Sequence, residues 1–336
     1  MSNEIITVIF NPASAGGKTG KKLPLIKLLL NRYFANDYQL SITSKPLDAT
    51  TFTRKALKYG HQTIVAVGGD GTIQEVVNGF FDRGIMINSR AKLGIINCGT
   101  GCGLAQSLNL PQELEKQLET IKNNNSQRID IGKAFFRTGG SSYSSRYFIN
   151  ELQLGIGGAV VKAAQNKYKK MGGFLGFGLT TLAIIFKQPN QKISISIDNQ
   201  KPIHRAFLGI MIANGAYTGG GMNLAPHARL NDHLLDILLM YAQTVPQRLM
   251  TFPKIYSGRH IELPKFGYFQ AKHISVDTKE DVLLEADGEL LGYPPCDIEI
   301  IDSCIKVFTN SKPSQFSVEP REYLKKKGSC HEKIIY

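Results

Sequence analysis

The sequence has no tryptophan, only five cysteines and little that resembles a membrane span. An odd number of cysteines without paired metal-ligand spacing argues against a zinc site and favours reduced thiols in the cytoplasm. The one apolar candidate for a span, residues 171–186, has 16 uncharged residues, four of them glycine. Crossing a bilayer takes roughly 20 residues. The N-terminal MSNEIITVIF carries an early acid and a short apolar run, which predicts a first strand and not a signal peptide.

Acidic residues are also fewer than basic ones. The sequence has 27 Asp and Glu and 40 Lys and Arg, which gives a net charge of +13. A hydrophobic content of 42% and a charged content of 20% describe a globular protein with room for two domains. The positive charge favours an anionic partner such as nucleic acid, acidic lipid headgroups or phosphorylated small molecules. Since lipid headgroups explain the charge as well as nucleic acid does, we expect no nucleic-acid partner.

The periodicity of apolar residues changes near Asp130. Before it, strands are expected at 6–10, 38–43, 63–67 and 93–96, and helices at 21–34, 50–59, from 72 onward and in segments up to 118. This alternation predicts a parallel sheet covered by helices on both faces. After it, short alternating runs at 192–198, 206–213, 234–241, 268–276 and 281–287 predict an antiparallel β-rich domain.

The predicted fold is therefore an α/β N-terminal domain followed by a β-rich C-terminal domain. We place the first at residues 1–130, with a returning segment at about 303–320, and the second at 131–302. Residues 321–336 form a basic tail that is expected to be loosely ordered.

Three segments of small residues follow three of the expected parallel strands. They are 11–19 (NPASAGGKT), 68–72 (GGDGT) and 98–103 (CGTGCG). Ligands of open α/β sheets bind beyond the carboxyl ends of the strands, where backbone amides and helix N-termini attract anions. Thr72 and Glu75 fit a capping box, which predicts a helix that starts directly after Asp70.

Two common phosphate-binding motifs are absent. Gly17-Lys18-Thr19 looks like the end of a P-loop, but Pro12 stands where that motif requires glycine. No G-x-G-x-x-G follows the first strand either, which excludes a Rossmann dinucleotide motif. The three loops therefore predict another kind of phosphate site.

GGDGT, with an apolar strand before it and EVVNG after it, resembles the catalytic domain of the diacylglycerol kinase family, which includes bacterial lipid kinases and sphingosine kinases. Further segments resemble motifs of that family and stand in the same order, from about residue 6 to about 308. They are FNPASAGG, Thr43 with Asp48-Ala49, LGIINCGTGCGLAQSLNLP, RIDIGKA, GGGMNLAPHARLNDHLLDIL and LEADGE.

The resemblance implies a two-domain fold similar to that of the diacylglycerol kinases and NAD kinases, with ATP between the domains and a lipid acceptor on the β-rich one. It places the nucleotide at Asn11, Pro12, Ala13, Ser14, Thr43, Gly68, Gly69, Asp70, Gly71, Thr72 and Thr100. The glycines would let the backbone approach the phosphates, and Asp70 would hold charge where Mg²⁺ bridges them.

The turn Asp287-Gly288-Glu289 lies between apolar alternating runs, which by itself is typical of a hairpin. The resemblance implies that this turn supplies the carboxylate that deprotonates the acceptor hydroxyl. In an extended chain Asp287 and Glu289 would face the same side. We take Glu289 as the base and Asp287 as the residue that orders the site.

The resemblance also implies a structural Mg²⁺ at Asp232, with backbone carbonyls near Arg229 and Leu234 as further oxygen ligands. A plain loop aspartate is the alternative. The family's glycine after this aspartate is His233 here, which would constrain the backbone if the position is left-handed.

A second departure concerns the third loop, where Cys102 and Gly103 replace the asparagine and aspartate of bacterial members. An acid expected near Asp70 is therefore missing. Sphingosine kinases also lack it, so the acceptor need not be diacylglycerol.

The function that we predict is that of a cytoplasmic, ATP-dependent lipid kinase with diacylglycerol, a sphingoid base or a related lipid as acceptor. Residues 171–186 and the preceding Lys162, Lys167, Lys169 and Lys170 would contact an anionic membrane, or else 171–186 packs as a buried helix. Two alternatives are a kinase of a soluble acceptor such as NAD and a catalytically silent lipid- or nucleotide-binding protein. The sequence leaves the choice between monomer and homodimer open.

Overall fold

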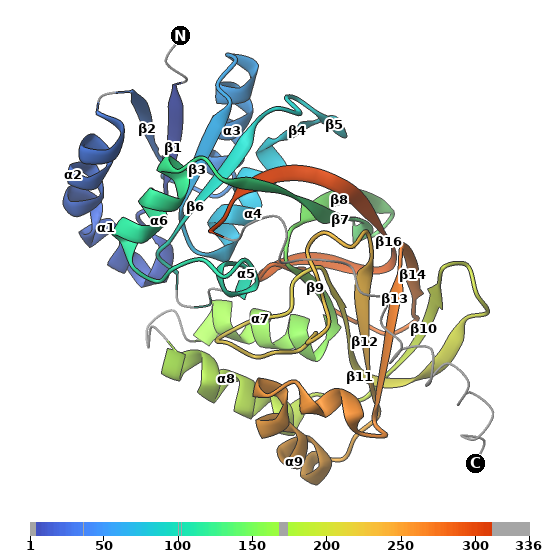
Figure 1. Cartoon of the computed structure of the whole chain (residues 1–336). Helices are drawn as coiled ribbons and strands as arrows, with labels where there is room; N and C mark the ends of the chain where they lie inside the picture. The colour runs from blue at the N-terminus through green and yellow to red at the C-terminus, as the bar shows by residue number, and fades with distance from the viewer. Residues whose placement is uncertain (1–4, 36, 100, 102, 168–173, 311–336) are drawn as a thin grey trace.

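The computed structural model describes residues 5–310 except 36, 100, 102 and 168–173, and omits the side chains of 165–180 (Figure 1). The helical elements are η1 (Ser14–Gly17), α1 (Lys18–Lys21), α2 (Leu23–Phe34), α3 (Asp48–Lys58), α4 (Asp70–Gly79), α5 (Gly103–Ser107), α6 (Leu114–Lys122), α7 (Ile156–Lys167), α8 (Phe174–Lys187), α9 (Val245–Tyr256) and η2 (Arg259–Glu262). The strands are β1 (Ile6–Phe10), β2 (Tyr38–Ile42), β3 (Thr63–Gly68), β4 (Phe81–Asp82), β5 (Ile85–Met86), β6 (Lys92–Asn97), β7 (Ser126–Gly139), β8 (Ser142–Phe148), β9 (Glu151–Gly155), β10 (Gln191–Ile197), β11 (Ile203–Ala213), β12 (Leu235–Tyr241), β13 (Phe266–Ala271), β14 (His273–Asp277), β15 (Leu284–Ala286) and β16 (Glu289–Phe308).

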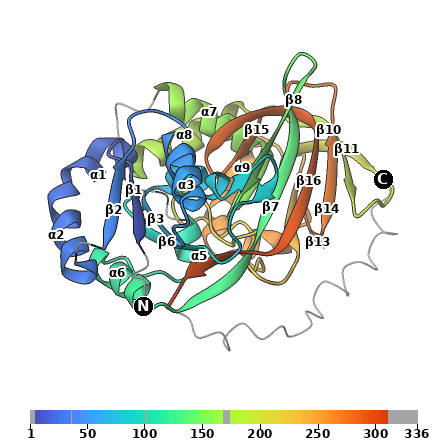
Figure 2. The same cartoon turned by 90° about the horizontal axis from the view of Figure 1, so that it is seen from above.

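The N-terminal domain is a parallel sheet between two layers of helices. Its strands run in the order β2-β1-β3-β6. The apolar stripe of α2, with Ile26 and Leu30, packs on one face together with α6, and α3 and α4 cover the other face through residues such as Ala56 and Val76. Figure 2 shows α2 and α6 on one side of the strands and α3 on the other. The predicted α/β fold is confirmed.

One long strand, β16, joins the parallel sheet to the antiparallel one. Most of it pairs antiparallel with β7, β14 and β15, but Lys306 and Val307 pair parallel with β6. A single sheet thus passes through both domains, and Asp130 lies inside β7. The return of the chain to the N-terminal sheet is seen at Lys306 and Val307, whereas residues 311–320 and the basic tail 321–336 lie outside the described residues.

The C-terminal domain is β-rich and antiparallel, as predicted, although two expected strands differ. The run 268–276 forms β13 and β14, because the chain changes partners at Lys272. β13 pairs with β12, whereas β14 pairs with β10 and β16. The carboxylate of Asp198 holds this corner by accepting the N–H groups of Lys272 and His273. In the run 281–287 only β15 is a strand.

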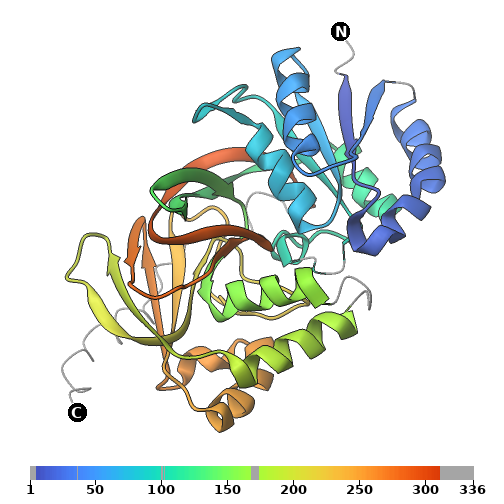
Figure 3. The same cartoon turned by 180° about the vertical axis from the view of Figure 1, so that it is seen from behind.

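Three helices cover one face of the β-rich domain. Figure 3 shows α7, α8 and α9 stacked on the same side of its strands. Apolar residues of β11 and β12, such as Leu208 and Met240, form a core cluster here, with Ile156 of α7 and Ile255 of α9 packed against it. In the described part of the chain, no helix is both long and apolar enough to cross a membrane.

Candidate active site

The three glycine loops meet at the carboxyl edge of the parallel sheet. Asn11 of the first loop donates a side-chain hydrogen bond to the Thr72 hydroxyl at 2.9 Å. The Thr19 hydroxyl donates to the carbonyl of Cys98 at 3.4 Å, and the Cys98 N–H donates to the carbonyl of Gly68 at 2.7 Å. Because every loop is bonded to another, the three segments form one surface.

The glycines of these loops are required first by the protein itself. A Cβ atom at Gly68 would lie 2.4 Å from the Thr72 hydroxyl, and one at Gly99 would lie 2.6 Å from the Cα of Gly69. Both distances are shorter than real Cβ contacts allow. The loops could not pack on one another with larger residues at these positions. The glycines are therefore needed for this packing, and not only for the approach of phosphates.

The helix after the second loop, α4, begins at Asp70 and lacks the expected capping box. No side chain caps its N-terminus among the described residues. The Thr72 hydroxyl accepts the bond from the first loop, and the Glu75 carboxylate accepts the N–H groups of Leu47 and Ala49 at the start of α3. The capping-box prediction is wrong because tertiary partners outcompete the local ones.

A cavity of about 360 Å³ extends from the glycine loops into the β-rich domain. Gly69, Asp70, Gly71, Gly99 and Gly101 line one end. Apolar side chains from α7, α8, α9 and the strands beneath them line the other end, among them Val160, Ile185, Leu224, Met240, Phe252 and Phe266. The cavity therefore joins the glycine loops to an apolar chamber.

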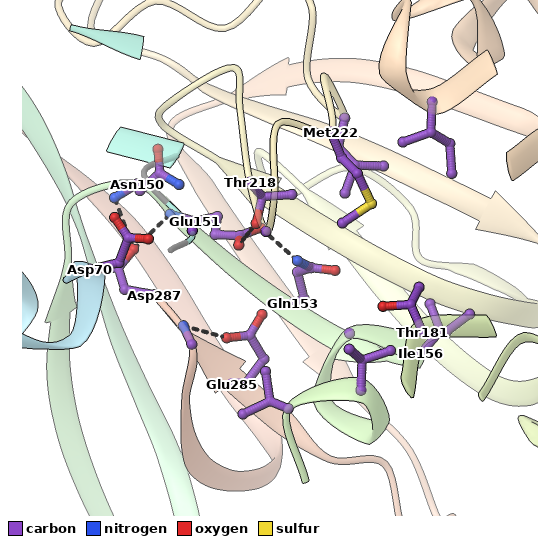
Figure 4. A pocket seen from close by; sticks show the side chains of 18 of the residues that line it. Asp70, Asn150, Glu151, Gln153, Ile156, Thr181, Thr218, Met222, Glu285 and Asp287 are labelled. Carbon is purple, nitrogen blue, oxygen red and sulfur yellow. Dashed lines mark hydrogen bonds between the residues drawn. The ribbon is translucent and has the colours of Figure 1, made fainter. Parts of the chain in front are cut away.

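Asp287 lies in the wall of this cavity, near Asp70 (Figure 4). Its buried carboxylate accepts the N–H groups of Ile149, Asn150 and Glu151 at 2.9–3.0 Å. Burial raises the pKa of Asp287 to about 7, against the lowering effect of these three bonds, and the charge of Asp70 raises it further. The three bonds hold this carboxylate in one orientation.

Glu289 does not face the same side as Asp287, contrary to the extended-chain prediction. Asp287 and Gly288 have φ values of 48° and 84° and form the turn between β15 and β16. Glu289 forms an ion pair with Arg146 at 2.9 Å and is absent from the described cavity lining. Burial raises the pKa of Glu289, and Arg146 lowers it. Its other carboxylate oxygen lies 3.5 Å from where a Cβ of Gly71 would be, beside the second loop.

The remaining predicted nucleotide residues surround the same edge of the sheet. The Ser14 hydroxyl donates to the Thr19 hydroxyl at 2.6 Å, and the N–H of Ala13 donates to the side chain of Asn11. The carbonyl of Pro12 accepts from Gly20. Buried Thr43 follows β2 and donates its N–H to Phe10. Thr100 lies outside the described residues, and Gly69, Asp70 and Gly71 are the predicted nucleotide residues that line the cavity within the described part.

The predicted structural metal ligands Arg229, Asp232 and Leu234 lie in the loop before β12, apart from the described cavity lining. The N–H of Leu234 donates to the Asp232 carboxylate at 3.3 Å. Next to them, His233 has a left-handed φ of 64°, so the constraint expected from replacing glycine is present. Its N–H donates to buried Asp130 at 2.8 Å, which holds this backbone.

The His233 imidazole forms a small cluster with Asp130 and Asp302 in which one ligand atom of each residue lies within 4.8 Å of the others. The Asp130 carboxylate in this cluster already accepts the N–H of Ser303. The cluster thus connects β7, β16 and the loop before β12. The exposed side chain of His233 therefore makes a structural contact in this fold.

The β-rich domain fills the space beside Gly103 of the third loop. A Cβ atom at Gly103 would lie 2.6 Å from the carbonyl oxygen of Tyr217. An aspartate at position 103 would therefore collide with the loop after β11. The neighbouring Cys102 lies outside the described residues.

Among the polar residues of the cavity that sequence reasoning missed are Glu151 and Gln153 on β9 and Glu285 on β15. All three are buried. The alternation of polar and apolar residues in ELQLG contained a signal, because it predicts that one face of this strand is not apolar core. The strand pattern alone does not show that this face lines a cavity, because the cavity is formed by segments that are distant in the sequence.

The comparisons with known proteins agree with this architecture. Residues 5–134 match the model of the diacylglycerol kinase catalytic domain, and residues 152–309 match that of the YegS C-terminal NAD kinase beta sandwich-like domain. The chain is 28% identical to a diacylglycerol kinase of Staphylococcus carnosus (strain TM300) and 29% identical to one of Staphylococcus saprophyticus subsp. saprophyticus, each over 90% of this chain and 94% of the relative.

Solved structures share the fold. A diacylglycerol kinase from Bacillus anthracis str. Sterne superimposes with a TM-score of 0.66 at 21% identity, over 91% of this chain and 97% of that one. At this identity the likeness concerns the fold alone. With both domain models matched in order, the chain belongs to the family that combines a diacylglycerol kinase catalytic domain with a YegS-like C-terminal domain.

Proposed function

We propose that the protein is an ATP-dependent lipid kinase that transfers the γ-phosphoryl group of ATP to a lipid hydroxyl. The observation that carries this proposal is one continuous cavity that joins Asp70 and the glycine loops to a chamber walled by α7, α8 and α9. A phosphate chain fits the first end, and a hydrocarbon chain fits the second. The diacylglycerol kinase name of the relatives supports the lipid acceptor.

The residues present fit a divalent cation at the phosphate end. Asp70 and Asp287 place two carboxylates close enough for the charge of one to raise the pKa of the other, and hard cations such as Mg²⁺ prefer such oxygen donors. When bound there, Mg²⁺ would supply charge stabilisation for the phosphate oxygens. Asp70 and Asp287 would hold it.

The proposed chemistry is an in-line displacement. A bond forms between the acceptor oxygen and the γ-phosphorus, the bond from that phosphorus to the β–γ bridging oxygen breaks, and ADP leaves. The hydroxyl proton passes to Glu289, whose free oxygen lies beside Gly71 of the second loop. The loops orient the phosphates, since phosphoryl transfer depends mainly on positioning and charge neutralisation.

Labelled ATP supplied with mixed micelles of diacylglycerol, a sphingoid base or a monoacylglycerol, and separately with NAD, tests this function. We expect one lipid product that requires a divalent metal and no labelled NADP. The apolar chamber is the reason, because a nicotinamide dinucleotide would leave it unfilled. Label in NADP alone would establish the soluble-acceptor alternative, and label in no product would favour a silent binding protein.

We also propose that exposed side chains of α8 and α9 touch an anionic membrane. Phe186 on α8 is 51% exposed and Met250 on α9 is 76% exposed, and Lys187 and Lys254 are exposed on the same helices. Figure 1 shows these two helices side by side, on the far side of α7 from the N-terminal domain. An apolar surface with nearby cations is suited to a negatively charged lipid interface. Of the predicted contact segment, residues 168–173 and the side chains of 165–180 lie outside the described residues.

The double variant Phe186→Ser, Met250→Ser is expected to bind vesicles of phosphatidylcholine with phosphatidylserine about tenfold more weakly, because exposed apolar area is lost. Binding of the unsubstituted protein should weaken as salt rises. Co-sedimentation measures both effects. Ile85→Ser is the matched control, since Ile85 is 73% exposed on the N-terminal domain and its loss should change nothing. Equal losses in both variants, or salt-independent binding, would contradict this surface.

A further inference from the structure

The helix α4 presents a polar stripe to the β-rich domain. Asp70, Gln74 and Asn78 are spaced by four residues, so they lie on one face of this helix. Asp70 lines the cavity at its phosphate end, and Gln74 and Asn78 are buried. The Asn78 side chain donates to the carbonyl of Tyr147 at 2.9 Å and accepts the Tyr147 N–H at 3.0 Å. The stripe therefore fixes α4 against β8.

Gln74 lies in the middle of this stripe and uses both ends of its side-chain amide. Its Nε2 donates to the backbone carbonyl of Ala286 at 3.0 Å, and its Oε1 accepts from the Arg146 guanidinium at 3.4 Å. Because the Gln74 side chain is completely buried, water cannot replace either partner. Both bonds cross from the N-terminal domain to the β-rich domain.

The two bonds reach both sides of the turn that carries the proposed base. Ala286 is the last residue of β15, directly before the turn. Arg146 donates from the same Nη2 to the carboxylate of Glu289, the first residue of β16 after the turn, at 2.9 Å. The amide of Gln74 therefore links α4 to the backbone before the turn and, through Arg146, to the carboxylate after it.

We propose that Gln74 is a positioning residue for phosphoryl transfer, which holds the Glu289 carboxylate at a fixed place relative to the phosphate end of the cavity at Asp70. This inference rests on the proposed lipid kinase function. α4 carries Asp70 in its first turn and Gln74 one turn later, and the backbone hydrogen bonds of the helix keep this spacing constant. One buried amide thus transmits the position of the second glycine loop to the base.

Gln74→Met removes both hydrogen bonds and keeps an unbranched side chain of the same length. We expect kcat to fall by about 10–10²-fold, because a displacement of a reacting group by about 1 Å costs up to about 10²-fold. The KM for ATP should stay within about twofold, since Gln74 is absent from the described cavity lining and does not touch bound substrate. Steady-state kinetics with the lipid that the unsubstituted protein phosphorylates measures both.

Gln191→Met is the matched control. Gln191 is also a buried glutamine that donates from Nε2 to a backbone carbonyl, that of Asp281 at 3.1 Å, and accepts from one side chain, that of Gln188 at 3.0 Å. It lies at the start of β10 and is absent from the described cavity lining. Both variants should lower the melting temperature, because each removes two hydrogen bonds of a buried side chain. Only Gln74→Met should lower kcat.

A double-variant cycle separates positioning from a general loss of structure. Because Gln74 acts through Glu289, Gln74→Met should lower kcat by less than about threefold in a Glu289→Gln background, where the carboxylate is already gone. A residue that only stabilised the fold would lower kcat by the same factor in both backgrounds. Equal factors, or a Gln74→Met enzyme with the kcat of the unsubstituted protein, would overturn the inference.

Hydrogen exchange tests the inference separately from the function on which it rests. Gln74→Met should speed exchange of the backbone N–H groups of residues 286–290, whereas Gln191→Met should not. Unchanged exchange at these residues overturns the inference. A lipid product formed with undiminished kcat by Gln74→Met also overturns it and leaves the kinase function intact. Faster exchange in Gln74→Met, with no lipid phosphorylated by the unsubstituted protein, contradicts the kinase function and supports Gln74 as the residue that holds the turn.

Discussion

Asp70→Asn is expected to lower kcat by about 10³-fold or more and to leave the melting temperature within a few degrees of the unsubstituted protein. The carboxylate lies at the phosphate end of the cavity, close to Asp287. A metal held there would contribute several kcal/mol of charge stabilisation in the transition state, and each 1.36 kcal/mol is about a factor of ten in rate.

The free energy of unfolding should change little in this variant, because the charge of Asp70 has two opposing effects on it. Asp70 is the first residue of α4, where a negative charge stabilises a helix by about 0.3–1 kcal/mol. Against this, its charge disfavours the ionised forms of the buried Asp287 and Glu151, and asparagine removes that repulsion.

Glu75→Gln is the matched control for Asp70→Asn, because it removes a carboxylate from the same helix. Glu75 accepts backbone N–H groups at the start of α3, so its loss should lower stability and leave kcat within about twofold. Steady-state kinetics and thermal unfolding of both variants measure these effects. An Asp70→Asn enzyme that keeps most of its kcat would remove Asp70 from the proposed metal site.

The glycine loops could be predicted from the sequence because their information is local. Each loop directly follows an apolar strand, and strands of a parallel sheet bring their carboxyl ends to one edge. Asp70 therefore had to lie at that edge once β3 was recognised. The capping box at Thr72 and Glu75 is also a local pattern, yet it was wrong, since Asn11, Leu47 and Ala49 supply competing partners from distant segments.

Glu151, Gln153 and Glu285 form a polar face of the cavity. This face could not be predicted, because it depends on the register in which β9 pairs with β15. Glu151 and Glu285 are far apart in the sequence, and they share a face only because Glu285 pairs opposite Gln153. A shift of one residue would send Glu285 into the core. In the same way, the exclusion of an acid at Gly103 depends on the carbonyl of Tyr217, which no local pattern places there.

The second large effect is expected at the turn between β15 and β16, where Glu289→Gln should lower kcat by about 10²–10⁴-fold. A lipid hydroxyl is a poor nucleophile at neutral pH, so a positioned base contributes this much. Glutamine has the shape of glutamate and can still accept the hydrogen bond from Arg146. The KM for ATP and the melting temperature should therefore stay nearly unchanged.

Asp287→Asn should act differently, since three backbone N–H groups hold this carboxylate in place. Its two oxygens accept three N–H groups, and an amide would turn a donor toward at least one of them. An unsatisfied buried donor costs about 1–3 kcal/mol. Burial raises the pKa of Asp287 to about 7, so its ionised form is disfavoured in the fold. We therefore expect the free energy of unfolding to fall most at acidic pH and least at pH 8, where the variant removes this buried charge. The kinetic loss should be smaller than in Glu289→Gln or appear in KM.

Arg146→Gln distinguishes a base from a merely structural carboxylate. Arg146 lowers the pKa of Glu289, so its removal should raise that pKa. A base acts in its ionised form, and the acid limb of the kcat–pH profile should therefore move to higher pH, while kcat at alkaline pH recovers. Unchanged profiles would show that Glu289 takes no proton.

A folded, inactive Asp287→Asn together with a fully active Glu289→Gln would transfer the role of base to Asp287. Equal losses in both variants would mean that the two carboxylates act as a unit.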